Sequence, residues 1–159
     1  MVALKVIIGG TFGYLHMGHR ALLSKAFEIG DYIYIGLTSN AYVKRMKHPG
    51  IPTYSKRKAL LEGFVKGLGK KFEITKLDDR FGPSTTGDFD AIVVTKETLS
   101  AARDINRIRR MNDLKPLSIV RINYVLAADS KPISTTRILR GEISPEGALL
   151  HRITRMRRR

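Results

Sequence analysis

Short apolar runs that alternate with segments of helical spacing are the feature that most constrains this chain. The runs are rich in β-branched residues and bounded by glycine or other turn formers, and they predict buried strands at 4–10, 31–39, 71–77, 90–95 and 117–126. Strands this apolar need cover on both faces, which is typical of a parallel sheet. We therefore expect an α/β fold: a Rossmann-like open parallel five-stranded sheet with helices on both faces.

The segments between these runs predict the covering helices. Leucine and alanine recur at helical spacing over 18–29, and 40–48 is interpreted as a short helix or ordered loop that the prolines after it end. Ser55 is expected to cap the next helix. The apolar stripe predicted for that helix consists of Leu60, Leu61, Phe64, Val65 and Leu68.

The second half of the chain predicts three more helices. A turn-rich loop follows the third strand, and a helix is expected over 96–112 with Leu99, Ala102, Ile105 and Ile108 facing inward. Two short helices are expected to finish the chain. The second is predicted to start near Pro145 and to use Leu149, Leu150, Ile153 and Met156.

Length and composition predict one domain over 1–159 with a basic tail at about 151–159. The chain has no cysteine, which excludes disulfides and thiolate metal sites. No apolar run approaches the roughly 20 residues of a membrane span. The N-terminus lacks a signal-peptide pattern, so we expect a cytoplasmic protein that does not bind membranes.

The charge balance favours anionic partners. Lys and Arg number 29 against 14 Asp and Glu, for a formal net charge of +15. Nucleic acid, a phosphorylated ligand or an acidic surface would each suit this balance. Adaptation to a hot or high-salt cell interior is the alternative explanation. The sequence leaves the oligomeric state open.

The segment GGTFGYLHMGHRALL, from Gly9 to Leu23, places His16 and His19 where the first strand gives way to the first helix. Ligands of open α/β sheets bind at such strand ends, and a helix N-terminus attracts phosphate. The segment matches neither the Walker A motif nor G-x-G-x-x-G. Two histidines without a nearby carboxylate make a weak metal site, so no metal ligands are predicted. A histidine pair at an ordinary turn is the alternative.

Two segments resemble signatures of the nucleotidylyltransferase superfamily. GTFGYLHMGH is similar to G-T-F-D-x-x-H-x-G-H, and PISTTRILR is similar to I-S-S-T-x-I-R, carried from Ile133 to Ile138. The segments YSKRKALLEGF, RFGPSTTGDFDAIVVTKET and INRIRRMNDLKPLSI narrow the resemblance. They are similar to the phosphopantetheine adenylyltransferase of archaea and of the eukaryotic CoA synthase. The resemblance extends to about Gly147.

The resemblance implies a pantetheine-phosphate adenylyltransferase of coenzyme A biosynthesis. Such an enzyme transfers AMP from ATP to 4′-phosphopantetheine and gives dephospho-CoA and pyrophosphate. The reaction is an in-line attack without a covalent intermediate, which calls for positioning and charge neutralisation. Mg²⁺ would be carried mainly by ATP.

The resemblance also implies residue roles. His19 would stabilise the α-phosphate, His16 would contact the nucleotide phosphates, and Lys44 would pair with the acceptor phosphate. Thr11 would contact both ATP and the acceptor, and Arg57 is a second candidate for acceptor contact or else a surface residue. Arg137 is expected to neutralise the leaving pyrophosphate. The remaining ATP-binding residues implied are Gly10, Phe12, Gly18, Ser134, Thr135 and Thr136.

The sequence departs from the family pattern at two positions. Gly13 stands where the first signature has Asp, and Asn40 stands where relatives often carry Asp. A cytidylyltransferase for an alcohol phosphate and a nicotinamide mononucleotide adenylyltransferase share both signatures, so they remain alternatives. A basic nucleic-acid-binding module on a degenerate enzyme fold is a third. Among Arg103, Arg107, Arg109 and Arg110 one is expected to reach ATP and most to be solvated.

Overall fold

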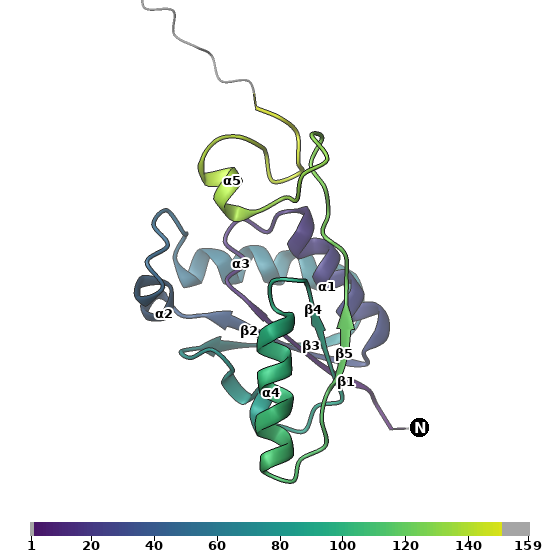
Figure 1. Cartoon of the computed structure of the whole chain (residues 1–159). Helices are drawn as coiled ribbons and strands as arrows, with labels where there is room; N and C mark the ends of the chain where they lie inside the picture. The colour runs from purple at the N-terminus through teal and green to yellow at the C-terminus, as the bar shows by residue number, and fades with distance from the viewer. Residues whose placement is uncertain (1, 151–159) are drawn as a thin grey trace, which may run out of the picture.

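A five-stranded parallel sheet lies at the centre of the computed structural model, which describes residues 2–150 (Figure 1). The spatial order is β3-β2-β1-β4-β5. The strands are β1 (Lys5–Gly10), β2 (Tyr32–Thr38), β3 (Lys71–Leu77), β4 (Ala91–Val94) and β5 (Ser118–Arg121). The predicted fold class is confirmed. The last strand is shorter than the predicted 117–126 because residues 122–125 leave the sheet and line a cavity.

The strand order reverses beside β1. From β1 the chain moves to β2 and then β3 on one side, and it returns to place β4 on the other side. β1 pairs with β2 over all six of its residues, whereas only Val6 and Ile7 pair with β4. The two strands therefore part before their carboxyl ends, because Ile8–Gly10 of β1 and Val93–Val94 of β4 lie beyond the last pair. This is the switch point where open α/β sheets bind ligands.

Helices cover both faces of the sheet, as Figure 1 shows. α1 (Met17–Ile29) and α3 (Tyr54–Val65) share one buried cluster with Val6 and Ile8 of β1. α4 (Leu99–Met111) packs against the opposite face, where Ile7 belongs to a second cluster. Successive strand side chains point to opposite faces, so β1 contributes to both cores.

Shorter elements complete the described residues. The short helices are α2 (Asn40–Arg45) and α5 (Thr135–Leu139), and the 3₁₀ turns are η1 (Lys66–Leu68) and η2 (Gly82–Thr85). In Figure 1, α5 and the segment around it lie beyond the end of the sheet at which β1 and β4 finish. Within residues 2–150, no helix is both long enough and apolar enough to cross a membrane.

The start and the buried face of α3 differ from the prediction. Thr53, not Ser55, caps the helix, because its hydroxyl accepts a hydrogen bond from the Lys56 N–H at 3.4 Å. Leu61 is fully buried, but its neighbour Leu60 is 52% exposed. Arg57 occupies the buried face instead, so the apolar stripe is narrower than the pattern indicates.

The prediction of a second terminal helix, starting near Pro145, is wrong over the residues that the structure describes. Gly147 adopts a φ of 86° and its N–H bonds the Ser144 carbonyl at 2.9 Å, which turns the chain back. Ile143 then pairs with Leu149 as an antiparallel bridge. A glycine with positive φ breaks helical periodicity. Ile153, Met156 and the predicted tail at 151–159 lie outside the described residues.

Most of the four arginines of α4 are exposed, as predicted, and Arg109 is the one that is buried. Its guanidinium donates to the carbonyls of Lys115, Ser84 and Gly87 at 2.8–3.0 Å. Arg109 therefore holds the loop around η2 against α4. The other three arginines of α4, at positions 103, 107 and 110, are exposed as expected.

The adjacent leucines of α3 provide a matched test of this packing. We expect Leu61→Ala to lower the free energy of unfolding by about 2–5 kcal/mol, because it leaves a cavity in the core. Leu60→Ala should change it by less than about 0.5 kcal/mol, as surface substitutions usually do. Urea denaturation measures both. Equal losses would contradict the placement of α3.

Candidate active site

The turn between β1 and α1 is held in an unusual backbone conformation. Phe12 and Leu15 have φ values of 47° and 45°, in the left-handed region that non-glycine residues rarely adopt. Such conformations cost on the order of 1–3 kcal/mol each, and they persist where surrounding contacts enforce them. Phe12 is only 1% exposed, so core packing holds the turn in place.

His16 caps α1 with its side chain. Its Nδ1 accepts a hydrogen bond from the His19 N–H at 3.2 Å. Because Nδ1 is the acceptor, the neutral imidazole carries its proton on Nε2, which leaves that N–H as a donor. A Cβ on Gly18 would stand 2.9 Å from Cε1 of His16, so the His16 ring needs glycine at that position.

His19 stacks on this ring. The centroids of His16 and His19 are 3.6 Å apart with an interplanar angle of 14°, and Phe12 meets His19 edge-on at 5.2 Å. Burial lowers the pKa of His16 to about 4. Burial and the neighbouring His16 lower the pKa of His19 to about 3. Both histidines are therefore neutral near pH 7 and act as hydrogen-bond donors without carrying charge.

A cavity of about 270 Å³ opens beside these rings, and we call it the histidine cavity. It is formed by the β1–α1 turn, the residues after β4 and β5, and the start of α5. Its polar side chains are those of His16, His19, Thr95, Glu97, Thr98, Asn123, Tyr124, Ser134, Thr135 and Thr136. Neither lysine nor arginine is among the described residues that line it. Its side-chain donors are thus hydroxyl, imidazole and amide groups.

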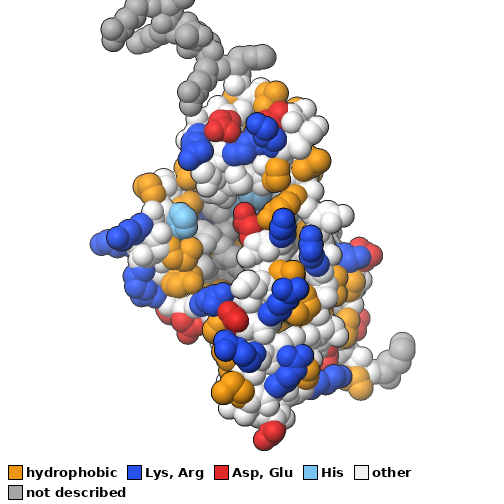
Figure 2. Space-filling view, viewed as in Figure 1, with side chains coloured by type: hydrophobic (Ala, Val, Ile, Leu, Met, Phe, Trp, Pro, Cys, Tyr) orange, Lys and Arg blue, Asp and Glu red, His pale blue; other side chains and the backbone are white. Residues whose placement is uncertain are grey.

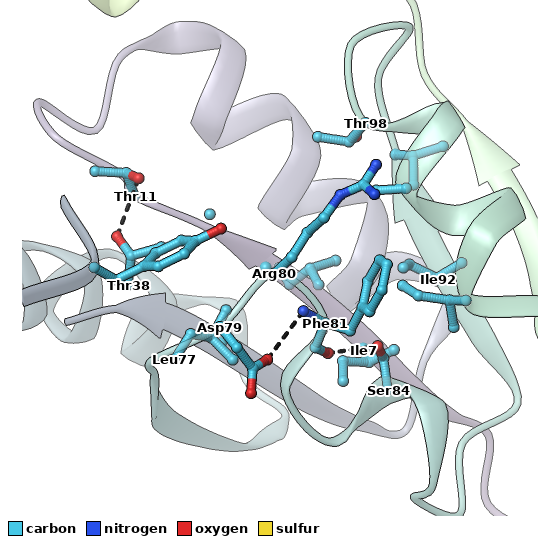
Figure 3. A pocket seen from close by; sticks show the side chains of 18 of the residues that line it. Ile7, Thr11, Thr38, Leu77, Asp79, Arg80, Phe81, Ser84, Ile92 and Thr98 are labelled. Atoms are coloured by element: carbon cyan, nitrogen blue, oxygen red, sulfur yellow. Dashed lines mark hydrogen bonds between the residues drawn. The ribbon is translucent and has the colours of Figure 1, made fainter. Parts of the chain in front are cut away.

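A second cavity, of about 250 Å³, lies on the face of the sheet that α4 covers, with walls from β1, β2, β3 and β4, and we call it the apolar cavity (Figure 3). Ile7, Ile92, Leu77 and Phe81 are among its apolar walls. Its polar side chains are those of Thr11, Thr38, Tyr42, Asp79, Arg80, Ser84 and Thr98. It suits a largely uncharged, elongated group with a few hydrogen-bonding positions.

The two cavities meet at the carboxyl end of β1. Gly9, Gly10 and Thr98 line both of them. Figure 2 shows this face of the molecule hollowed between the α2 side and the α4 side, with Lys and Arg side chains around the rim. Two ligands bound in the two cavities would therefore meet at the β1–α1 turn.

Arg57 lies beneath this junction and is fully buried, so its prediction as an exposed helix residue is wrong. Its guanidinium donates to the backbone carbonyls of Thr11 and Thr38 at 3.1 and 2.7 Å. It also donates to the Pro52 carbonyl at 2.8 Å. Burial lowers the pKa of Arg57, although an arginine remains charged at neutral pH.

Comparison with known proteins places this geometry in a family. Residues 7–141 match the cytidylyltransferase-like family model. A phosphopantetheine adenylyltransferase of Methanosarcina mazei is 45% identical over 150 residues, which cover 91% of this chain and 96% of that protein. One of Methanothermobacter thermautotrophicus is 43% identical over 149 residues, 93% of this chain and 90% of that protein. The chain belongs to the phosphopantetheine adenylyltransferase family.

A solved structure supports the fold. A protein with unknown function from Archaeoglobus fulgidus is 29% identical and superposes with a TM-score of 0.70. The match covers 82% of this chain and all of that one. The phosphopantetheine adenylyltransferase resemblance drawn from the sequence segments is thereby confirmed at the level of the family and the fold.

Most residues that the family signatures single out lie together. His16, His19, Gly10, Phe12, Gly18 and the hydroxyl residues 134–136 all line the histidine cavity. Thr11 lines the apolar cavity. Ser134 also caps α5, because its hydroxyl accepts from the Arg137 N–H at 3.3 Å.

Arg137 and Lys44 are placed elsewhere. The Arg137 guanidinium pairs with the carboxylates of Asp129 and Glu142, and the latter lies at 3.0 Å. These partners raise the pKa of Arg137. Lys44 is exposed on α2, and it is not among the residues that line either cavity. Their predicted phosphate contacts stay predictions.

The two departures from the family pattern have different surroundings. A Cβ on Gly13 would lie 3.3 Å from Ile51 and 3.6 Å from Thr135, so this part of the turn packs against α5 and the loop before α3. The Asn40 side chain accepts a hydrogen bond from the Tyr54 N–H at 2.7 Å. Asn40 therefore supports the start of α3.

Sequence reasoning missed the cavity residues that follow β3, β4 and β5. They include Asp79 and Arg80 after β3, Thr98 after β4, and Asn123 and Tyr124 after β5. Their place after strands is the signal that could have found them, since ligands bind beyond the carboxyl ends of parallel strands. The prediction applied that rule only to the first strand and to the two signatures.

The cavity residues also decide how Mg²⁺ could be held. Over residues 2–150, no three His, Asp or Glu side chains gather as a metal site. Glu97 is the carboxylate that lines the histidine cavity. Mg²⁺ keeps several waters and binds through few carboxylates plus substrate phosphates. This donor set fits an ion that arrives on a triphosphate.

The lowered histidine pKa values predict a loss of stability in acid. In the unfolded chain both histidines bind a proton as the pH falls below 6.5. In the folded chain His16 and His19 bind one only near their lowered pKa values of about 4 and about 3. The free energy of unfolding contributed by these groups is therefore full above pH 6.5 and falls as the pH drops toward 4.

Denaturation at pH 7 and pH 4.5 measures this loss. We expect the His16→Gln/His19→Gln double variant to lose less stability between the two pH values than the wild type. His48→Gln is the control because His48 is exposed. A double variant that loses as much as the wild type would contradict the buried, neutral state of the pair.

Proposed function

We propose that the chain transfers AMP from ATP to 4′-phosphopantetheine, forming dephospho-CoA and pyrophosphate. The observation that carries this proposal is the meeting of two different cavities at the end of β1. One is lined by imidazole and hydroxyl donors and the other by apolar side chains. Their junction is where two phosphate groups would have to meet.

The histidine cavity suits the nucleotide. α1 directs its first turn at this cavity, and the partial positive charge of a helix start favours an anion there. The N–H groups of Met17 and His19 are already bonded to the Pro145 carbonyl and to His16 Nδ1. Ser134, Thr135 and Thr136 add hydroxyl donors from the opposite wall. Mg²⁺ bound to the triphosphate would neutralise part of its charge. The protein then provides position and hydrogen bonds for the phosphate oxygens.

The apolar cavity suits the acceptor. The pantetheine arm is uncharged and elongated, and it carries amide groups that need a few polar partners. Asp79, Tyr42 and the backbone can provide these partners between the apolar walls. Thr11 lies at the end of the cavity near the junction and suits the terminal phosphate.

The chemistry needs little proton transfer. The attacking acceptor phosphate is already anionic, so no general base is required for its oxygen to attack the α-phosphorus of ATP. Charge builds on the α-phosphate in the transition state, and donors aimed at it lower the barrier. The low pKa keeps His19 neutral at pH 7, and the one ring N–H of a neutral imidazole can donate to an oxygen of the α-phosphate. The bond to pyrophosphate breaks on the opposite side of the phosphorus.

The reaction itself is tested by pyrophosphate release. We expect release only when MgATP and 4′-phosphopantetheine are both present. The controls omit the acceptor, replace ATP by CTP, or offer nicotinamide mononucleotide as the acceptor. Release with CTP or with nicotinamide mononucleotide, and none with phosphopantetheine, would assign the chain to another transferase of the superfamily.

The role of His19 is tested by replacement. We expect His19→Ala to fold normally and to lower kcat on the order of 10²–10³-fold, as loss of one transition-state donor does. His48→Ala should leave kcat unchanged, since His48 is exposed on the loop after α2. Steady-state rates and a thermal melt measure both variants. A His19→Ala rate within a few-fold of the wild type would remove His19 from the mechanism.

A further inference from the structure

Arg57 is a buried cation with an incomplete set of partners. Its Nε and Nη1 atoms donate to three backbone carbonyls and to the hydroxyl of Thr38 at 3.2 Å. Its Nη2 is buried and has no hydrogen-bond partner among the described residues. The salt bridges of the described part of the chain do not include Arg57. Its positive charge is thus left without a neighbouring carboxylate.

The hydrogen bonds from Arg57 have one possible direction. A guanidinium can only donate, so the Thr38 hydroxyl must accept from Arg57. In the structure the Thr38 hydroxyl in turn donates to the Thr11 hydroxyl, whose oxygen lies 3.0 Å away (Figure 3). Since the Thr11 oxygen is the acceptor of this bond, its own proton is free to point elsewhere. Thr11 and Thr38 both line the apolar cavity.

We propose that Arg57 and Thr38 are positioning residues that orient the Thr11 hydroxyl as a donor to the terminal phosphate of the acceptor. The chain of donors runs from Arg57 through Thr38 to Thr11 and ends in the cavity. An anionic oxygen can accept a hydrogen bond from the Thr11 hydroxyl, whereas a ligand group that only donates cannot. The inference rests on the proposed function, because it assigns the phosphate of 4′-phosphopantetheine to this end of the cavity.

The backbone contacts of Arg57 reinforce this orientation. Nη1 donates to the carbonyls of both Thr38, the last residue of β2, and Thr11, which directly follows β1. This single guanidinium nitrogen therefore holds the two threonines together. The charge of buried Arg57 also adds a positive field at the place where the phosphate would bind, and burial reduces its screening by solvent.

The sharpest variant removes one hydroxyl and keeps the shape of the side chain. In Thr38→Val, Arg57 retains its three carbonyl acceptors, while the Thr11 hydroxyl loses the donor that orients it. We expect KM for 4′-phosphopantetheine to rise about five- to tenfold, the usual effect of one lost hydrogen bond between neutral groups. KM for ATP should stay within about twofold, and Thr38→Ser should restore the acceptor KM.

A matched control lies on the next strand. Thr75 is half-buried on β3 and lines neither cavity, so Thr75→Val tests the general effect of this exchange in the sheet. Arg57→Lys keeps the positive charge but loses the planar guanidinium whose Nε and Nη1 both donate, and it should also raise the acceptor KM. A thermal melt of every variant identifies any that fail to fold. If Arg57→Lys fails to fold, the result with Thr38→Val decides the test.

Binding of pantetheine, which lacks the phosphate, separates orientation from simple structural support. We expect Thr38→Val to weaken binding of 4′-phosphopantetheine and to leave binding of pantetheine unchanged. Equal weakening of both ligands would show that Thr38 only supports the fold and would overturn the inference. An unchanged acceptor KM in Thr38→Val would overturn it as well. A wild type that releases no pyrophosphate from ATP and 4′-phosphopantetheine would instead overturn the proposed function on which it rests.

Discussion

Burial of both faces of a parallel sheet is the constraint on which the rest of this structure depends. Helices occupy both faces, so the polar groups that bind ligands are left with the ends of the strands. The strand order reverses beside β1, and the pairing of β1 with β4 stops before the carboxyl ends of both strands. Both cavities open there, and each takes its walls from loops that follow different strands.

The site handles charge in a way that the composition does not suggest. A net charge of +15 indicates anionic ligands, yet the described lining of the histidine cavity holds neither lysine nor arginine. Two buried arginines, Arg57 and Arg109, instead hold backbone carbonyls around the apolar cavity. Arg137 is neutralised by two carboxylates. Donors that contact a phosphate can thus be neutral while the cations lie behind them.

The strained turn and the stacked histidines serve one purpose in this arrangement. Left-handed Phe12 and Leu15 turn the chain from β1 into α1, and Gly18 leaves room for the His16 ring. His16 then binds the first turn of the helix, which settles its tautomer and supports the face of His19. A pair of neutral imidazoles at a helix start is preorganised to donate, and preorganised donors need little rearrangement when charge develops.

The sequence by itself determined the fold class, the five strands and eight of the residues that line the histidine cavity. It could do so because apolar strand periodicity and the two signatures are local patterns. Only the tertiary structure decided that Leu60 is exposed, that Thr53 caps α3 and that Gly147 turns the chain where a helix was predicted. It also decided that Arg57 lies beneath Thr11, and not on the surface. Contacts between residues 46 positions apart leave no local signal, because they arise only when the ends of β1 and β2 are brought together above α3.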